Sequence, residues 1–217
     1  MSDDALFTWA VVVPVKVLAR AKSRIAPLAG SRRAELALAM ASDTISAVVA
    51  SPVGERVIVV TDDPVTAGEL AGLGATVVPD EPRAGLNEAL AHGVSCAARL
   101  WPGSGAGALS GDLPALRPEE LAVALRAAAA CPEAFVPDLQ GSGTTLYTAR
   151  PGAAFRPAFG PDSRFRHVAQ GAAELLLPGI DGLRRDVDTG EDLRDAARLG
   201  LGARTSAVAT ELLRPAG

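Results

Sequence analysis

Residues 9–15, WAVVVPV, form a short run of apolar and mostly β-branched side chains near the start of the chain. Such a run is typical of a strand buried inside a parallel sheet. Two similar runs predict further strands at residues 56–61 and 75–79, and the short segment GALS at residues 107–110 is interpreted as a fourth. Helical patterns separate and follow them, one capped by Ser31 and others over residues 64–73, 86–100 and 118–130. This repeated alternation predicts a parallel sheet with right-handed crossovers.

The pattern changes after residue 130. Residues 133–138 and 144–149 are two strand-like runs with glycine-rich sequence between them, which predicts a hairpin-like pair. We expect a helix from about Arg164, a short strand near residues 184–187 and a last helix from Glu191. A length of 217 residues suits one α/β domain, and no internal repeat or low-complexity linker divides the chain.

Composition excludes several classes of protein. Lys+Arg 21 against Asp+Glu 25 gives a net charge of −4, which argues against a general nucleic-acid binder or a protein of anionic membranes. No apolar stretch approaches the roughly 18 residues of a membrane span, and the acidic start MSDDALF is unlike a secretion signal. Two cysteines are too few for a disulfide framework or a Cys-based zinc site. We therefore expect a cytoplasmic protein.

A basic segment follows the first predicted strand, where open α/β sheets bind ligands. Residues 14–27, PVKVLARAKSRIAP, contain no glycine, so neither the dinucleotide fingerprint nor a P-loop is present. They do contain both lysines of the chain, Lys16 and Lys22, together with Arg24. Ammonium and guanidinium groups suit a phosphate tail, so the segment is a candidate triphosphate site. The alternative is a solvated loop that pairs with surface acids.

Carboxylates occur at two distant places that suit a metal ion. Asp112 follows Gly111 at the end of the fourth predicted strand, and Asp186 and Asp188 alternate in DVDTGEDL. Residues two apart in an extended segment share a face. Magnesium prefers a few carboxylates completed by substrate phosphate oxygens, and would neutralise charge on a pyrophosphate leaving group. A turn aspartate and ordinary helix-start acids are the plainer interpretation.

Two glycine-bearing polar segments, GSGTT (141–145) and FGPDS (159–163), are candidates for an acceptor site. Ser163 is expected to cap a helix whose unpaired N–H groups face an anion. Asn87 lies in the first turn of another predicted helix, where it suits hydrogen bonding to a base or ribose but is also a routine helix-start residue. The two histidines show no Ser–His or Cys–His signature, and His167 is interpreted as structural rather than as a ligand contact.

The chain resembles the guanylyltransferases of deazaflavin coenzyme (F-420) biosynthesis almost from end to end. The segments that carry the resemblance are VPVKVLARAKSRIAPL, DEPRAGLNEAL, SGDLPAL, GSGTT, FGPDSRFRH and DVDTGEDL. It implies one Rossmann-like nucleotidyltransferase domain, with a mostly parallel sheet flanked by helices and a small β insertion, related to the molybdopterin guanylyltransferases. Within it, residues 9–130 or so would form the nucleotide-binding half, and about 131–200 the acceptor-binding half.

The resemblance also implies a metal and a nucleotide site. Asp112 and Asp186 would hold Mg²⁺, with Asp188 as an additional ligand or a group next to the ligands. The catalytic residues implied are Asp112, Asp186 and Lys22. The GTP contacts implied are Lys16, Lys22, Arg24 and Asn87.

The acceptor implied by the resemblance is phosphoenolpyruvate, which would contact Thr144, Gly160 and Ser163. The products would be enolpyruvyl-2-diphospho-5′-guanosine and pyrophosphate. Transfer to 2-phospho-L-lactate or 3-phosphoglycerate is the alternative within the family. A sugar-phosphate nucleotidyltransferase, a glycosyltransferase and a catalytically silent nucleotide-binding module are the alternatives outside it. A homodimer is a further possibility that the sequence leaves open.

Overall fold

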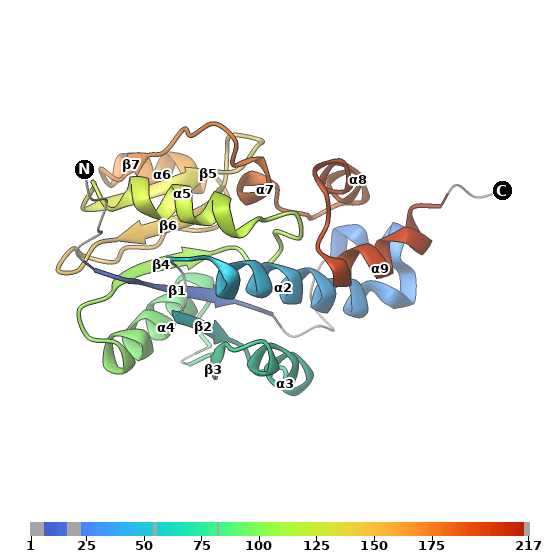
Figure 1. Cartoon of the computed structure of the whole chain (residues 1–217), viewed down its shortest axis with the longest axis horizontal. Helices are drawn as coiled ribbons and strands as arrows, with labels where there is room; N and C mark the ends of the chain where they lie inside the picture. Colours follow the sequence, from blue (N-terminus) through green and yellow to red (C-terminus); the bar gives the residue numbers. More distant parts are fainter. Residues whose placement is uncertain (1–6, 17–22, 54–55, 82, 215–217) are drawn as a thin grey trace.

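The computed structural model describes residues 7–16, 23–53, 56–81 and 83–214 (Figure 1). Its centre is one seven-stranded sheet in the order β3-β2-β1-β4-β6-β5-β7. The strands are β1 (Trp9–Pro14), β2 (Arg56–Val60), β3 (Thr76–Val78), β4 (Gly105–Leu109), β5 (Glu133–Pro137), β6 (Thr144–Ala149) and β7 (Ala173–Glu174). Neighbouring strands among β1 to β4 pair in parallel, whereas β6 runs antiparallel to both β4 and β5. The predicted hairpin-like pair is therefore confirmed, and it extends the same sheet.

Helices cover both faces of the sheet. They are α1 (Ala26–Ala29), α2 (Arg33–Ala50), α3 (Pro64–Gly72), α4 (Leu86–Leu100), α5 (Pro118–Ala128), α6 (Ser163–Ala169), α7 (Asp181–Arg184), α8 (Gly190–Leu199) and α9 (Ala203–Leu212). α2 and α5 pack on the face that carries Val11 and Val13, and α4 packs on the face that carries Val12. Because both faces of β1 are covered, its sequence is apolar throughout instead of alternating.

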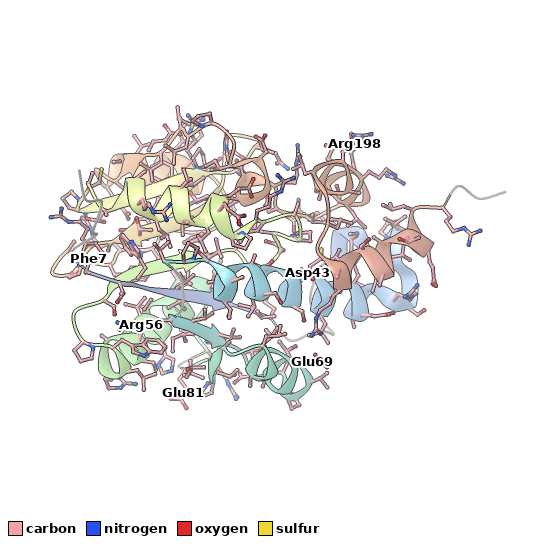
Figure 2. All side chains as sticks on the ribbon, viewed as in Figure 1. Phe7, Asp43, Arg56, Glu69, Glu81 and Arg198 are labelled. Atoms are coloured by element: carbon pink, nitrogen blue, oxygen red, sulfur yellow. The ribbon has the colours of Figure 1, made fainter. Side chains whose placement is uncertain are left out.

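A third apolar cluster lies at one end of the molecule, where α1, α8 and α9 gather around the first half of α2 (Figure 1). Asp43 on α2 fixes α9 in this cluster (Figure 2): its carboxylate accepts hydrogen bonds from the N–H groups of Arg204 (3.2 Å) and Thr205 (2.7 Å). These N–H groups belong to the first turn of α9, which has no partner for them within its own helix. A side chain of α2 thus caps α9.

The strands predicted at residues 9–15, 56–61, 75–79 and 107–110 are confirmed, each within two residues. The strand at 107–110 begins earlier, at Gly105, where a Cβ would lie 2.6 Å from the Trp9 ring. Any side chain at residue 105 would collide with the Trp9 ring, so glycine is required at this position of the strand.

Three local predictions were wrong. Residues 184–187 form no strand, because α7 ends at Arg184 and the segment after it makes one backbone hydrogen bond, to Asp112 in the loop after β4, instead of pairing with a strand. The helix from about Glu191 is not the last, since α9 follows it. Ser31 does not cap α2, which begins directly after a short 3-10 helix over Gly30–Arg32. Among the described residues, no helix has both the length and the apolar character that crossing a membrane requires.

Candidate active site

The site lies where the chain leaves the carboxyl ends of β1 and β4. β1 pairs with β2 on one side and with β4 on the other, so the order of the strands reverses here, which is where open α/β sheets bind ligands. The loops that follow β1 and β4 touch where they leave the sheet, because a Cβ at Gly111 would lie 3.2 Å from the carbonyl oxygen of Pro14. Lys16, two residues beyond Pro14, is exposed beside this point.

Asp112 and the late DVD segment meet at the same place. The N–H of Val187 donates a 3.1 Å hydrogen bond to the carbonyl oxygen of Asp112. Val187 is fully buried in the third cluster, whereas Asp186 and Asp188 on either side of it are half-buried. In an extended segment, neighbours of an inward side chain point the other way. The structure therefore brings the backbones of the predicted metal ligands together, although they lie far apart in sequence.

The basic segment reaches one of these carboxylates. An Arg24 guanidinium nitrogen lies 2.6 Å from a carboxylate oxygen of Asp188. The Arg24 side chain is 71% exposed, so this ion pair contributes little stability and an incoming phosphate can displace it. Lys22, a further predicted phosphate contact, lies outside the described residues, as do all of residues 17–22.

No group of three or more His, Cys, Asp or Glu side chains within the described ranges is arranged to hold a metal ion. Two aspartates on touching segments, completed by substrate oxygens, remain compatible with the hard oxygen ligands that Mg²⁺ takes. The donor chemistry fits a divalent ion that arrives with a nucleotide, and the ligand roles of Asp112, Asp186 and Asp188 stay predictions.

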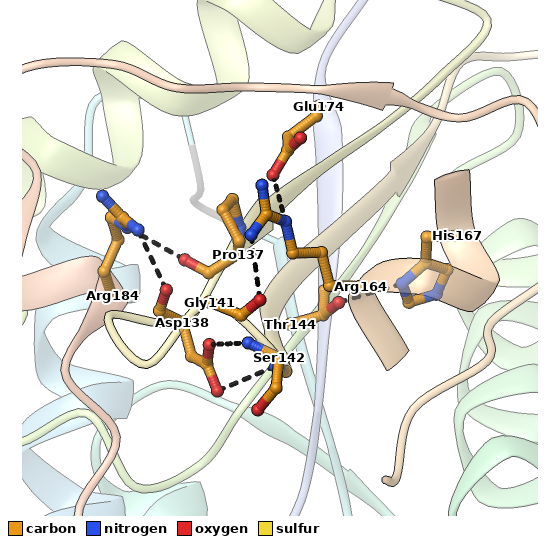
Figure 3. A network of polar contacts seen from close by, with 10 residues as sticks. Pro137, Asp138, Gly141, Ser142, Thr144, Arg164, His167, Glu174 and Arg184 are labelled. Carbon is orange, nitrogen blue, oxygen red and sulfur yellow. Dashed lines mark hydrogen bonds and ion pairs between the residues drawn. The ribbon is translucent and has the colours of Figure 1, made fainter. Parts of the chain in front are cut away.

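On the acceptor side, a bulge in β6 sets the direction of Thr144. Leu146 pairs with Val136 and Thr144 pairs with Pro137, which leaves Thr145 as an extra residue between them. A bulge of this kind turns the next side chain to the other face of the sheet. Thr144 accordingly contacts His167, with 3.0 Å between its Oγ1 and the ring Nδ1 (Figure 3).

The turn before β6 is held by Asp138 (Figure 3). Its carboxylate accepts hydrogen bonds from the N–H groups of Ser142 (3.0 Å) and Gly143 (2.9 Å). A Cβ at Gly143 would overlap this carboxylate, so the residue there must be glycine. Arg184 fixes the other side of the turn, because its guanidinium donates to the carbonyl oxygens of Pro137 and Asp138. GSGTT is thus a rigid turn, supported from α7.

The FGPDS loop joins this turn through the backbone. The N–H of Arg164 donates to the carbonyl oxygen of Ser142 (3.1 Å), and the N–H of Ser163 donates to that of Gly160 (3.1 Å). The two predicted acceptor segments therefore lie side by side. The expectation of unpaired N–H groups at this helix start is not met for these two residues, and Ser163 is the first helical residue, not the cap.

Two residues of the loop need a left-handed backbone. Gly160 has φ 115° and Asp162 has φ 55°. Only glycine adopts the first without strain, and a Cβ there would also lie 3.1 Å from the Arg166 guanidinium.

Arg164 contributes less positive charge than its position suggests, because its Nε lies 2.6 Å from Glu174.

Asn87 makes contacts that the sequence did not indicate. Its Oδ1 accepts from the N–H of Phe159 (2.8 Å), and its Nδ2 donates to the Phe159 carbonyl oxygen (3.2 Å). The amide therefore ties the FGPDS loop to the first turn of α4. One amide hydrogen is left over, so the predicted nucleotide contact stays a prediction.

His167 is the residue whose importance the sequence underrated. It is fully buried between the aromatic rings of Phe135, Tyr147 and Phe159, and stacks on Tyr147 with 4.6 Å between ring centres. Burial, reinforced by the charge of Arg166, lowers the pKa of His167 to about 4. Its only sequence signal is the spacing of four residues from Ser163, one helical turn.

Glu133 and Arg156 form an ion pair at the edge of this aromatic group. Tyr147 donates its hydroxyl hydrogen to Glu133. Burial favours the protonated carboxyl of Glu133, but the hydrogen bonds from Arg156 and Tyr147 outweigh it and keep the pKa of Glu133 below its usual value. Burial and the same carboxylate raise the pKa of Tyr147. Glu133 is thus a fixed negative charge near His167.

The fold is that of the nucleotidyltransferases. A nucleotidyl transferase from Methanothermobacter matches 88% of this chain and 97% of its own, with a TM-score of 0.61 and 20% identity. A protein of Mycobacterium tuberculosis H37Rv, solved in complex with manganese, matches 88% of this chain and 98% of its own, with a TM-score of 0.51 and 20% identity.

A match to a protein-family model identifies one family among the nucleotidyltransferases. The model described as guanylyl transferase CofC like matches residues 9–208, and the chain belongs to this family. A protein of Thermomonospora curvata named phosphoenolpyruvate guanylyltransferase is 59% identical over 211 residues, which cover 97% of this chain and 92% of that protein.

Proposed function

We propose that this protein transfers GMP from GTP to phosphoenolpyruvate, in the biosynthesis of coenzyme F-420. The products are enolpyruvyl-2-diphospho-5′-guanosine and pyrophosphate. The observation that carries the proposal is the 59% identity, across nearly the whole chain, to a relative named for this activity. The contact between the Asp112 and Val187 backbones supports it, because it brings two carboxylate-bearing segments to the nucleotide end of the sheet.

The reaction needs no general base. The second pKa of a phosphate monoester is about 6, so the acceptor phosphate is mostly dianionic at neutral pH. One of its oxygens forms the new bond to the α-phosphorus of GTP, and the bond from that phosphorus to the bridging oxygen of the β-phosphate breaks. Pyrophosphate leaves with the electron pair. Protein groups therefore contribute positioning and charge stabilisation.

Asp112 and Asp186 are the proposed ligands of a divalent cation, Mg²⁺ by its preference for carboxylate and phosphate oxygens. When bound there, the ion would offset the charge that develops on the leaving pyrophosphate. Asp188 is paired with Arg24 in this structure. Its carboxylate is proposed to release Arg24 to the GTP phosphates when GTP binds, and to turn to the cation instead.

The GTP tail is proposed to lie along the basic segment. Lys16 and Arg24 lie on either side of residues 17–22, the range that contains Lys22 and that the structure does not describe. Lys22 is proposed to stabilise the negative charge on the α-phosphate of GTP as the acceptor attacks it, as a compact ammonium does. Asn87 has one amide hydrogen left for the nucleotide once its contacts with Phe159 are made.

The acceptor is proposed to bind between the GSGTT turn and the FGPDS loop, in contact with Thr144, Gly160 and Ser163. The hydrogen bond between Ser142 and Arg164 holds these segments together. Two hydroxyls on a rigid frame suit the fixed geometry of a three-carbon acid with one phosphate and one carboxylate.

The proposal is tested with the purified protein, GTP and MgCl₂, and one acceptor at a time. Pyrophosphate release and the mass of the guanosine product are followed for phosphoenolpyruvate, 2-phospho-L-lactate, 3-phosphoglycerate and a hexose 1-phosphate. We expect turnover with phosphoenolpyruvate that chelation of Mg²⁺ abolishes. Preference for 2-phospho-L-lactate would move the assignment within the family, turnover only with the sugar phosphate would replace it, and GTP binding without any product would leave a binding module. Since GTP and phosphoenolpyruvate are made in the cytoplasm, the proposal places the protein there.

A further inference from the structure

The buried imidazole of His167 joins the two halves of the acceptor site. Its Nε2 accepts a 3.0 Å hydrogen bond from the N–H of Ala158, the residue immediately before the FGPDS loop. Its Nδ1 lies 3.0 Å from the hydroxyl oxygen of Thr144 on β6 (Figure 3). One ring therefore sets the distance between Thr144 and the loop that carries Gly160 and Ser163.

The two contacts fix where the ring proton lies. A backbone N–H can only donate, so Nε2 must be the unprotonated nitrogen that accepts from Ala158. In a neutral imidazole the proton is then on Nδ1, and Nδ1–H donates to Thr144. The ring is fully buried, and its pKa of about 4 keeps it neutral at physiological pH. The charges that act on it, Arg166 on its own helix and Glu133 on β5, do not alter this assignment.

The direction of this hydrogen bond decides what the Thr144 hydroxyl can do. A hydroxyl has one hydrogen to donate and two lone pairs to accept. Because the oxygen of Thr144 accepts from His167, its own hydrogen is not needed by the ring and can point toward an anion. Had the ring carried its proton on Nε2, Thr144 would donate to Nδ1 and present only lone pairs, which would repel an anionic acceptor.

We propose that His167 is a positioning residue, which holds the Thr144 hydroxyl in the orientation that donates its hydrogen to the anionic acceptor. The inference rests on the proposed function, since it takes Thr144 to contact the acceptor. A merely structural His167 would support the fold through its aromatic neighbours and the Ala158 contact alone.

Two substitutions separate these roles, because each keeps one of the two hydrogen bonds. In His167→Asn the side-chain amide N–H lies near the former Nδ1 and can still donate to Thr144. In His167→Gln the amide reaches the former Nε2 position and can accept from Ala158, but the Thr144 contact is lost. A neutral hydrogen bond contributes about 1 kcal/mol, so we expect His167→Gln to raise the KM for phosphoenolpyruvate roughly fivefold to tenfold.

His167→Asn is expected to recover most of that loss, while the KM for GTP stays the same in both variants. Thr144→Val and His167→Gln together form a double-mutant cycle. Once the Thr144 hydroxyl is absent, adding His167→Gln should raise the acceptor KM no further. Equal acceptor KM values for the Asn and Gln variants, a parallel rise in the KM for GTP, or independent effects in the double variant would each overturn the proposal.

A measurement on the unaltered chain covers the case in which a variant fails to fold. The chain has only two histidines, so ¹⁵N-labelled imidazole signals can be assigned with one His92→Gln sample. We expect His167 to show the neutral Nδ1–H form between pH 6 and 8, and an Nε2–H form would contradict the proposal. A wild-type protein without phosphoenolpyruvate activity refutes the proposed function instead, whatever the tautomer, so the two failures are distinguishable.

Discussion

At the scale of single residues, the candidate site consists of side chains that one or two short contacts hold in place. Asp112 could be singled out from the sequence as a candidate metal ligand, because a carboxylate after Gly111 at a strand end suits a metal, and that role stays a prediction. The contacts that His167 and Asn87 make could not be predicted, because their partners include backbone groups of residues 158 and 159 that no pattern in the sequence links to them. Residue types that suggest chemistry are visible in a sequence, whereas the groups that orient them are not.

Asp112→Asn should lower kcat about a hundredfold or more, because it removes a ligand charge from the proposed metal and costs several kcal/mol of transition-state stabilisation. Asp188→Asn should cost less, since the carboxylate it replaces is paired with Arg24 at the surface. Steady-state kinetics at saturating Mg²⁺ and GTP measure both. A kcat for Asp112→Asn within a factor of three of wild type would remove this residue from the metal site.

The buried ring of His167 should make stability depend on pH. Its pKa of about 4 lies below its ordinary value of 6.5, so the unfolded chain binds a proton first as the pH falls. The free energy of unfolding should therefore decrease between about pH 6.5 and pH 4, and be retained in full above that window. Urea denaturation of wild type and His167→Asn across this range isolates the effect, since the variant lacks the group. Parallel curves would mean that the ring is not held neutral.

At the scale of elements, the bulge in β6 and the turn before it frame the proposed acceptor site. The sequence predicted both strands of the pair, but a bulge is a property of the register between β5 and β6. Strand propensity therefore did not reveal that Thr144 turns toward α6. The segment after α7 was predicted wrongly for a related reason. Asp186, Val187 and Asp188 alternate in burial as a strand does, yet the backbone hydrogen bond of the segment, from Val187 to Asp112, goes to the loop after β4 and not to a strand.

Gly143→Ala tests whether the turn frames the acceptor. The added Cβ would displace the Asp138 carboxylate, which holds the N–H groups of Ser142 and Gly143. We expect a loss of about 1–3 kcal/mol in unfolding free energy and a raised KM for phosphoenolpyruvate, with the KM for GTP little changed. Gly72→Ala is the matched control, since its Cβ meets nothing within 4 Å and its φ, like that of Gly143, is not left-handed. A higher acceptor KM in the control than in Gly143→Ala would refute the role of the turn.

At the scale of the whole molecule, three apolar clusters hold the sheet, its helices and the C-terminal helices together. The parallel half was predictable because β-branched runs alternate with helical patterns at regular spacing. The docking of α9 was not, since it depends on Asp43, more than 150 residues earlier in the chain. Val187 belongs to the third cluster, so the packing of these helices also positions the DVD segment against Asp112.

Asp43→Ala should destabilise the fold by about 1–2 kcal/mol, because α9 loses the acceptor of its first-turn N–H groups. Asp43→Asn keeps one acceptor oxygen and should lose less. Thermal unfolding followed by circular dichroism measures both, and kcat well below the melting temperature should remain that of wild type. An Asn variant as unstable as the Ala variant would mean that charge, and not capping, is what Asp43 provides.

The central claim is that Asp112 and Asp186 share one divalent cation at the nucleotide end of the sheet. The most direct test is a crystal structure with Mn²⁺ and a non-hydrolysable GTP analogue, in which anomalous scattering locates the metal. We predict one peak about 2.1 Å from a carboxylate oxygen of each aspartate and from the nucleotide phosphates. A metal bound by phosphates alone, or with either carboxylate turned away from it, would contradict the account.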